Sequence, residues 1–278
     1  MTIDQFIENA LIEDIGDGDH SSLSTIPVDS KGKACLFVKS EGIIAGVEIA
    51  KKVFSKVDPE LKVNVSIADG AFVKTGDIAF TVEGSSISIL SSERLVLNFM
   101  QRMSGIATET NKYVKAVSGF KAKILDTRKT TPNMRYFEKL AVKIGGGENH
   151  RFGLYDMIMI KDNHVDFSGG IEKAISATKK YLLEKNKKLK IEIEVRSFEE
   201  LSKVISFGGV DRIMLDNFTP ENMKKAVEII DGKFETEASG GITLNNVRDY
   251  AETGVDFISI GALTHQIKSL DMSLKACK

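Results

Sequence analysis

The sequence predicts an α/β protein in which a parallel α/β barrel follows a β-rich N-terminal region. Three observations lead to this prediction: short β-like runs before residue 84, one long stretch with helical periodicity, and six later repeats of an apolar run followed by a helical stretch. Strands that alternate with helices along a chain form parallel sheets. The 278 residues, 42% of them hydrophobic, suffice for one large barrel or two modest domains.

The β-rich region covers residues 33–83. Its β-like runs are residues 34–39, 62–67 and 78–82, with glycine-containing turn signals between them. The pattern indicates a compact β-rich unit.

Residues 91–117 change the period of the apolar positions from strand-like to helical. Apolar residues recur there at three- and four-residue steps, which is typical of one face of a long helix. They are Val96, Met100, Met103, Ala107, Thr110, Val114 and Val117, with Thr110 the one polar member. We expect this helix to connect two domains.

Six apolar runs that end in polar residues follow the helix. They are residues 123–129, 157–164, 191–195, 212–217, 234–241 and 256–262. Helix starts between them are predicted by a capping box from Ser197 to Glu200, by Thr219 before Pro220, and by Thr243. Six units fall short of the usual eight, which favours a smaller or partly open barrel, with a doubly wound sheet as the alternative.

Composition excludes several classes of partner. The 38 basic and 39 acidic residues nearly cancel, so we expect neither nucleic acid nor a membrane surface as a partner, and any anion site must be local. No apolar run approaches the roughly 20 residues that span a bilayer. The two cysteines, Cys35 and Cys277, lack metal-ligand spacing, and the N-terminus lacks signal-peptide features, so a reducing cytoplasm is the expected compartment.

Polar residues gather at the predicted strand ends, which share one rim in a parallel barrel. The rim set is Arg128, Lys129, Lys161, Glu194, Asp216, Ser239 and Gly261. Arg128 and Lys129 lie among hydroxyl residues after the first of the six runs, a composition that suits phosphate or carboxylate. The alternative interpretation of this segment is a solvated loop.

Two further segments point to an anion site. Three glycines precede His150 and Arg151, which allows backbone N–H groups and both side chains to approach an anion, although a flexible turn is the alternative. Lys161 and His164 follow the next apolar run. The agreement of the segments favours a binding site for a small, multiply anionic, phosphorylated substrate.

The last runs end in acidic residues and glycines. Glu194 and Asp216 end successive strands and are candidate Mg²⁺ ligands, direct or through water, with acid/base work or a structural ion pair as alternatives. Glu192 shares the face of Glu194 but lies deeper, and it ranks below it. The glycine-rich segments at the ends of the last two runs are expected to bind a phosphate group through their backbone N–H groups. Their residues are Ser239, Gly240, Gly241, Gly261 and Ala262.

These motifs together resemble those of the quinolinate phosphoribosyltransferase family, also called carboxylating nicotinate-nucleotide pyrophosphorylases. The segments that carry the resemblance are residues 127–132, 145–154, 160–164, 215–217, 237–242 and 261–265. The resemblance extends over essentially the whole chain. It implies a six- or seven-stranded open α/β barrel formed by residues 105–265. An N-terminal α+β sandwich domain would comprise residues 1–104, joined by residues 266–278.

The resemblance also implies an activity: transfer of a phosphoribosyl group from phosphoribosyl pyrophosphate to quinolinate with decarboxylation, giving nicotinate mononucleotide, pyrophosphate and CO2 for NAD biosynthesis, with Mg²⁺ as cofactor. The implied quinolinate residues are Arg128, His150, Arg151 and Lys161, with Lys129 shared between the substrates and Thr127 beside them. Glu194 and Asp216 would face the ribose and Mg²⁺. Catalysis would rest on Lys129, Lys161, Glu194 and Asp216.

By the same resemblance, Arg94 belongs to the neighbouring subunit's site, so a homodimer is expected, with a hexamer of dimers as the larger assembly. Departures from the family pattern occur at Asn133, where glycine is usual, at residues 19–22, and at Arg196, where an acidic residue is common. The alternative function is that of a paralogous phosphoribosyltransferase found beside molybdate transport genes. A more distant alternative is a non-catalytic anion or nucleotide sensor.

Overall fold

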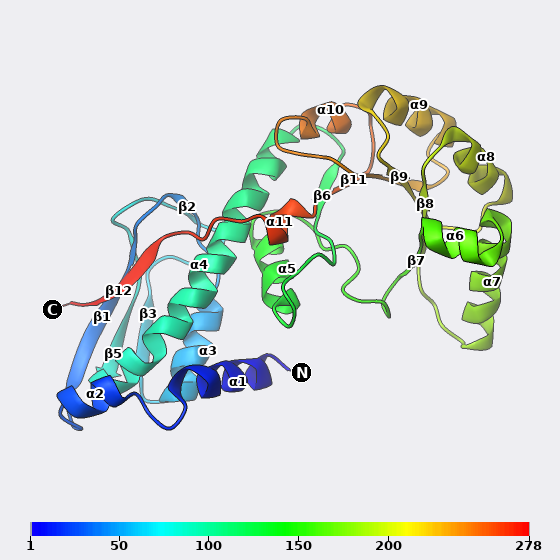
Figure 1. The fold of residues 1–278 in the computed structure, drawn as a ribbon. Helices are drawn as coiled ribbons and strands as arrows, with labels where there is room; N and C mark the ends of the chain where they lie inside the picture. The colour runs from blue at the N-terminus through cyan, green and yellow to red at the C-terminus, as the bar shows by residue number, and fades with distance from the viewer. Residues whose placement is uncertain (1, 278) are drawn as a thin grey trace. The chain divides into compact units, whose positions relative to one another are not determined.

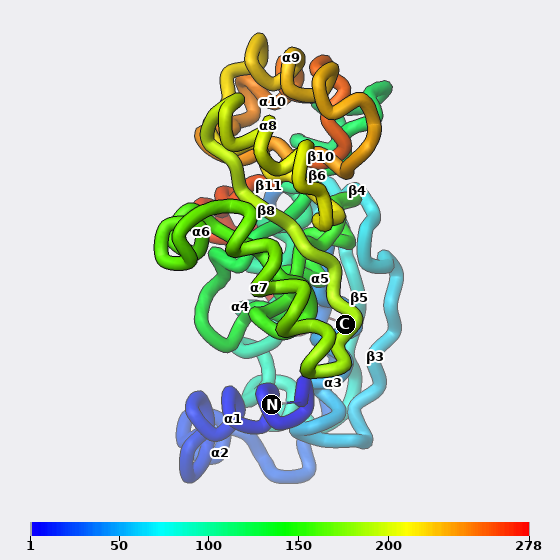
Figure 2. The backbone as a smooth tube through the Cα atoms, turned by 90° about the vertical axis from the view of Figure 1, so that its right-hand side faces the viewer, coloured from blue at the N-terminus to red at the C-terminus, as the bar shows by residue number. Residues whose placement is uncertain are grey.

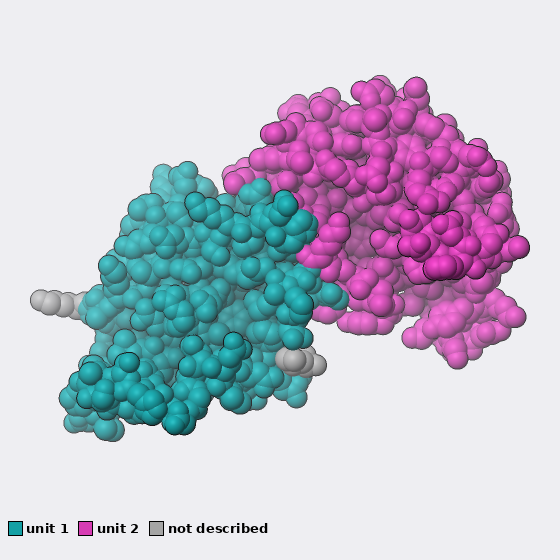
Figure 3. All heavy atoms as spheres, in the orientation of Figure 1, with its two compact units in different colours: residues 1–111, 130–146, 263–278 teal, residues 112–129, 147–262 magenta. Residues whose placement is uncertain are grey.

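The computed structural model describes residues 2–277 and divides the chain into two compact units (Figure 3). Unit 1 comprises residues 1–111, 130–146 and 263–278, and unit 2 comprises residues 112–129 and 147–262. The predicted boundary between residues 104 and 105 stays a prediction. Helix α4 (Ser86–Ala116) runs through that point without a break.

Unit 1 is built on a four-stranded antiparallel sheet with the strand order β12-β1-β5-β3. Its strands are β1 (Lys31–Val38), β3 (Lys62–Val65), β5 (Ile78–Ser85) and β12 (Met272–Ala276). A separate two-stranded sheet pairs β2 (Gly42–Ile43) with β4 (Phe72–Val73). The three predicted β runs of this region are therefore confirmed as β1, β3 and β5.

Helices complete unit 1. They are α1 (Ile3–Ile15), α2 (His20–Thr25), α3 (Val47–Val57), α5 (Arg135–Ile144) and the first part of α4. Helix α1 lies against α3 (Figures 1 and 2), and the ion pair between Lys56 and Glu8 joins the two helices. Phe54 of α3 meets Phe80 of β5 edge to face at 5.8 Å, and both rings are fully buried. This aromatic pair lies in the core of unit 1.

The predicted long helix is α4, which extends five residues further toward the N-terminus than expected. Of its predicted apolar stripe, Val96, Met100, Met103 and Ala107 are fully buried, which confirms the helical period. Thr110 is buried in the same stripe.

Unit 2 contains six parallel strands in the order β6-β11-β10-β9-β8-β7. They are β6 (Lys123–Leu125), β7 (Ile158–Ile160), β8 (Ile191–Val195), β9 (Arg212–Asp216), β10 (Glu235–Ser239) and β11 (Phe257–Ser259). Consecutive strands from β7 to β11 are neighbours, and β6 pairs with β11. A doubly wound sheet would reverse its strand order, so the order confirms an open six-stranded barrel.

Helices follow these strands around their outer side (Figure 1). They are α6 (Asp162–Ser168), α7 (Ile171–Glu184), α8 (Phe198–Phe207), α9 (Pro220–Ile230) and α10 (Val247–Ala251). The short α11 (Ala262–His265) follows β11, and from residue 263 onward the chain belongs to unit 1. Apolar strand residues such as Ile193, Ile213 and Ala238 are fully buried. They alternate along the strands with the polar residues described below.

Two of the three predicted helix starts are confirmed, those at Ser197 and Thr219, and the third needs correction. Thr219 caps α9, with Pro220 as its first residue. Ser197 caps α8, but the carboxylate of Glu200 accepts from the backbone N–H of Arg196 at 2.7 Å instead of closing a capping box. Helix α10 begins at Val247 rather than after Thr243, because the Asn246 side chain accepts the Thr243 N–H and holds residues 243–246 in a turn.

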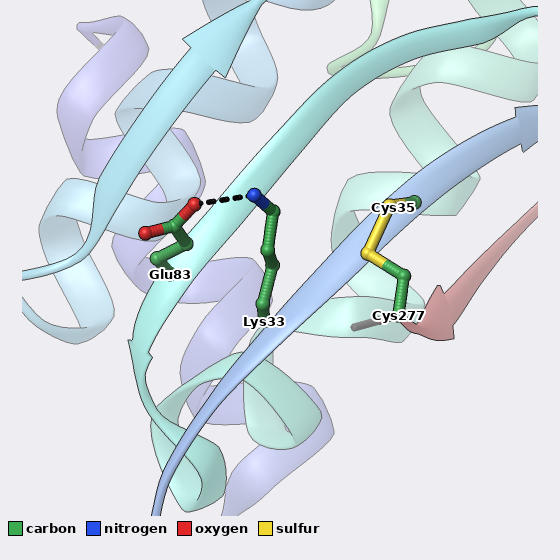
Figure 4. The surroundings of a disulfide bond; sticks show 4 residues. All are labelled: Lys33, Cys35, Glu83 and Cys277. Carbon is green, nitrogen blue, oxygen red and sulfur yellow. Dashed lines mark ion pairs between the residues drawn. A yellow bond between two sulfur atoms is a disulfide. The ribbon is translucent and has the colours of Figure 1, made fainter.

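A disulfide bond joins Cys35 of β1 to Cys277, just after β12 (Figure 4). The two cysteines are 242 residues apart in sequence. The sequence predicts no role for either cysteine and indicates a reducing compartment, so this bond was not expected. The bond links the first and last strands of the unit 1 sheet, beside the ion pair between Lys33 and Glu83.

None of the helices within residues 2–277 has both the length and the apolar character that a bilayer crossing requires.

Candidate active site

The inner face of the unit 2 sheet is lined with charged residues. Strand register places Glu192, Arg212 and Glu235 in one layer, Glu194, Met214 and Glu237 in the next, and Asp216 with Ser239 at the carboxyl ends. Successive side chains of a strand point to opposite faces, so every second residue of β8, β9 and β10 reaches this face, and all of these except Met214 are polar or charged. The carboxyl ends of the strands are the edge at which parallel barrels bind their ligands.

Four charged groups from different segments form a buried cluster below this edge. His150 Nε2 lies 2.9 Å from Glu192 Oε2 and 3.3 Å from Glu237 Oε2. Arg212 Nη1 donates to Glu237 Oε2 at 2.8 Å, and its guanidinium stacks on the Phe257 ring at 3.9 Å. Glu192 and Glu237 are both fully buried. The ligand atoms of His150, Glu192 and Glu237 lie within 4.8 Å of one another, which is also a metal-binding arrangement.

The other ring nitrogen of His150 has a partner as well. Nδ1 accepts the backbone N–H of Arg151 at 2.7 Å. Fully buried Asp126, directly after β6, accepts the backbone N–H of His150 at 2.9 Å and the side-chain amide of Asn149 at 2.5 Å. His150 therefore reaches a ligand only if it gives up one of these bonds, whereas Arg151 is half-buried and next to it in the chain.

Electrostatics keep a proton in this cluster. Burial lowers the pKa of His150, but its contacts with the carboxylates of Glu192 and Glu237, which would accept from its ring N–H, outweigh burial and raise that pKa to about 9. Burial and the charge of Glu237 raise the pKa of Glu192 to about 7. With Arg212 balancing one of the two carboxylates, one further proton makes the cluster neutral. Because Nδ1 of His150 accepts the Arg151 N–H, this proton lies on the other side of the ring, between Nε2 and the carboxylates of Glu192 and Glu237.

At the carboxyl ends themselves, Lys161 lies after β7 and Glu194 near the end of β8. Their Nζ and Oε2 atoms are 3.6 Å apart. Burial raises the pKa of Glu194, Lys161 lowers it, and the charge of Asp216 raises it again, with a net rise. The two carboxylates are thus close enough to repel each other, and a cation between them would relieve that repulsion.

The segment after β6 brings two more cations to unit 2. Thr127 and Arg128 are half-buried and Lys129 is exposed, and the Thr127 hydroxyl accepts the backbone N–H of Lys129 at 3.1 Å. Burial lowers the pKa of Arg151, and the nearby charge of Arg128 lowers it further. Two guanidinium groups held close to each other favour an anion between them.

The predicted phosphate segment lies at the ends of β10 and β11. The backbone N–H of Asn217 donates to the Ser239 carbonyl at 2.8 Å. Gly240 has a φ of 93°, and a Cβ there would lie 2.1 Å from Asn217 Oδ1, so only glycine fits. Gly241, Gly261 and Ala262 follow in exposed or half-buried positions. The role of these residues in phosphate binding stays a prediction.

Unit 2 therefore brings together all but one of the predicted site residues. The exception is Arg94, which lies on α4 in unit 1 with an exposed side chain. Arg196 turns toward acidic groups, with its guanidinium 2.8 Å from Glu200, so it does not oppose Glu194.

The roles of Asp126, Arg212 and Glu237 were not predicted from the sequence, and Glu192 was ranked below Glu194. For the two glutamates a signal was present, because acidic residues occupy alternate positions in β8 (Glu192 and Glu194) and in β10 (Glu235 and Glu237). Such alternation is unusual for strands of a parallel sheet, which read as continuous apolar runs when both faces pack against apolar layers.

Two family models match the chain. Residues 19–104 match the N-terminal domain of quinolinate phosphoribosyl transferase, and residues 106–275 match its C-terminal domain.

Individual proteins agree with these models. The chain is 47% identical to a chloroplastic nicotinate-nucleotide pyrophosphorylase [carboxylating] of Arabidopsis thaliana, covering 97% of this chain and 81% of that protein. It is 42% identical to a probable nicotinate-nucleotide pyrophosphorylase [carboxylating] of Bacillus subtilis, covering 99% and 93%. The crystal structure of NadC from Streptococcus pyogenes superposes with a TM-score of 0.93 at 38% identity, covering 99% of this chain and 97% of that one.

Proposed function

Because this chain belongs to the quinolinate phosphoribosyltransferase family, we propose that it transfers the phosphoribosyl group of phosphoribosyl pyrophosphate to quinolinate with loss of CO2. The products are nicotinate mononucleotide and pyrophosphate, in NAD biosynthesis. The observation that carries this proposal is the set of cations and carboxylates at the carboxyl ends of the unit 2 strands. Quinolinate has two carboxylates and the second substrate carries several phosphate groups, so both require local positive charge.

Arg128, Arg151 and Lys161 are the proposed quinolinate residues. The charge of Arg128 lowers the pKa of Arg151, which supports two neighbouring guanidinium groups, as two adjacent carboxylates require. Lys129, exposed at the end of the same segment, is shared with the pyrophosphate group. His150 is the further predicted member of this group.

Glu194 and Asp216 are the proposed partners of the ribose hydroxyls and of Mg²⁺. Two carboxylates together with substrate phosphates are an ordinary Mg²⁺ donor set, so the residues present fit the ion. Bound there, Mg²⁺ would supply charge for the departing pyrophosphate. The 5′-phosphate is assigned to Ser239, Gly240, Gly241, Gly261 and Ala262, where backbone N–H groups approach closely.

The proposed chemistry needs positioning and charge rather than a covalent nucleophile. The ring nitrogen of quinolinate forms a bond to the anomeric carbon as the bond to pyrophosphate breaks, with oxocarbenium character at the ribose. Lys129 and Lys161 stabilise the negative charge that develops on the leaving group. The carboxylate beside the new pyridinium nitrogen then leaves as CO2, and the carbon takes up a proton.

A homodimer in which Arg94 completes the neighbour's site is part of the proposal, with a hexamer of dimers as the larger assembly. Arg94→Ala and Lys161→Ala variants, each inactive alone, should regain up to about a quarter of wild-type activity when subunits are mixed, because one hybrid site then has both residues. No recovery in mixtures with proven subunit exchange would contradict the shared site.

The cytoplasm is the proposed compartment. The Cys35–Cys277 disulfide bears on this proposal because reducing compartments keep thiols reduced. Thiol labelling in freshly lysed cells tests it: reduced cysteines support the cytoplasm, and oxidised cysteines oppose it.

The deciding experiment mixes the purified protein with quinolinate, phosphoribosyl pyrophosphate and Mg²⁺ and follows nicotinate mononucleotide and CO2, with nicotinate as a parallel substrate. We expect both products from quinolinate and none from nicotinate. Binding of phosphoribosyl pyrophosphate without turnover of quinolinate would favour a paralogous enzyme with another substrate.

A further inference from the structure

Three fully buried carboxylates hold one short segment of unit 2. Asp126 binds the backbone and side chain of residues 149–150, while Glu192 and Glu237 both approach His150 Nε2. The His150 ring in turn restrains Arg151, because its Nδ1 accepts the Arg151 backbone N–H. The whole arrangement therefore ends at the backbone of Arg151.

We propose that Glu192 and Glu237 are positioning residues that act through His150 to fix Arg151 for quinolinate binding. This inference rests on the proposed function. Arg212 has the supporting role of balancing the charge of Glu237, which it contacts at 2.8 Å.

Stability alone does not account for these glutamates. Burying a carboxylate costs free energy, and replacing a buried ion pair by apolar residues is often neutral or stabilising. Met214 of β9 lies directly beside Glu237 of β10 in the same layer. An apolar side chain is therefore accommodated in this layer. Glu192 and Glu237 are instead both directed at His150, which is 4% exposed in its side chain.

A metal ion is the competing occupant of this cluster, since His150, Glu192 and Glu237 offer three ligand atoms. The Arg212 guanidinium argues against it, because it already contacts Glu237 and would repel a second cation. Metal content is therefore measured alongside the kinetics.

Glu235 provides a matched control for Glu237. Both side chains lie on the same face of β10 and both accept from Arg212, but only Glu237 has a contact with His150. The variants are Glu192→Gln, Glu237→Gln and Glu235→Gln, each nearly isosteric with the wild type.

We expect Glu192→Gln and Glu237→Gln to raise the KM for quinolinate by about 10- to 100-fold, as for the loss of hydrogen bonds to charged groups. The KM for phosphoribosyl pyrophosphate should stay within about twofold in each, because its residues lie elsewhere on the rim. Glu235→Gln should match the wild type in both constants. Equal KM changes for the two substrates, or a Glu235→Gln effect as large as that of Glu237→Gln, would overturn the proposal.

A double-mutant cycle tests the route through Arg151. If Glu192 acts through Arg151, the double variant Glu192→Gln with Arg151→Ala should bind quinolinate no more weakly than Arg151→Ala alone. Additive losses would place Glu192 in another role. If Glu192→Gln does not fold, His150→Asn replaces it in the cycle. The asparagine side-chain oxygen can take the place of Nδ1 and accept the Arg151 N–H, but the shorter side chain cannot reach Glu192 and Glu237.

Two outcomes separate this inference from the proposed function. Absence of quinolinate turnover in the wild type would remove the proposed function, and crystal structures of the wild type and Glu237→Gln would then decide whether the Arg151 side chain depends on Glu237. An unmoved Arg151 would sink the inference. Stoichiometric metal in the wild type that is lost in Glu192→Gln would also overturn it, in favour of a metal site.

Discussion

The two main sheets of this chain use their alternate positions in opposite ways. In the antiparallel sheet of unit 1, inward positions such as Leu36 and Phe80 are apolar and fully buried. In the parallel sheet of unit 2, one face is apolar and the other carries buried charges such as Glu192 and Glu237. Apolar burial stabilises, whereas buried charge is costly, so unit 1 is organised for stability, and the costly charges on the inner face of unit 2 support the binding role proposed for it.

The largest expected effect is on the stability of unit 1. Phe80→Ala should lower the free energy of unfolding by about 3–5 kcal/mol, because it leaves a cavity beside Phe54. The folded fraction should keep its kcat. Chemical denaturation with parallel kinetics measures both, with Ile78→Ala in the same strand as control, since Ile78 is 37% exposed. A large loss of kcat in folded Phe80→Ala would break the comparison.

Next comes the disulfide of the same sheet. Reduction should lower the unfolding free energy of unit 1 by about 2–4 kcal/mol without changing kcat, because the bond restricts the unfolded chain. Denaturation with and without dithiothreitol gives this value. The double variant Cys35→Ser with Cys277→Ser should have the stability of the reduced wild type, and any further response of that variant to dithiothreitol would refute the assignment.

On the binding side, Lys161→Ala should reduce kcat/KM for quinolinate by about 100-fold, or roughly 2.7 kcal/mol of transition-state stabilisation. Its melting temperature should be unchanged, because the side chain is exposed and its pair with Glu194 is 3.6 Å long. Lys203→Ala on α8 is the control, since Lys203 is also exposed and paired with an acidic residue. Near-normal kinetics in Lys161→Ala would remove Lys161 from the site.

The smallest expected effect is the pH dependence of stability that arises from Asp256, which directly precedes β11 in the unit 2 sheet. Burial alone would raise the pKa of Asp256, but Lys121 and hydrogen bonds from Thr236 lower it below 3.8. A depressed pKa contributes stability above the unfolded value that is lost as pH falls through the folded one. Wild type should therefore lose about 1 kcal/mol more than Asp256→Asn on acidification below pH 4. Equal acid sensitivity would show that Asp256 is not responsible.

Much of the fold could be predicted because it depends on local periodicity. The β runs of unit 1, helix α4 and the six parallel strands all follow from the spacing of apolar residues. The backbone at residue 133 also follows from local sequence. The family resemblance implies glycine at this position, and Asn133 has a φ of 65°, which asparagine tolerates better than most residues.

The features that could not be predicted depend on pairs of residues that are distant in sequence. Cys35 meets Cys277 only because β12 lies beside β1, and nothing local to either cysteine indicates it. His150 meets Glu192 and Glu237 only through the register of β8 and β10 with the segment after β6. Side-chain competition at Asn246 likewise moved the start of α10.

Strand β12 has a consequence for the order in which the chain folds during synthesis. Its partner β1 leaves the ribosome before the six strands of the barrel, whereas β12 is made after all of them. The barrel can therefore be complete while the earlier unit still exposes an open edge at β1, a site for improper strand pairing. Nascent chains stalled before residue 272 should be the most prone to aggregate.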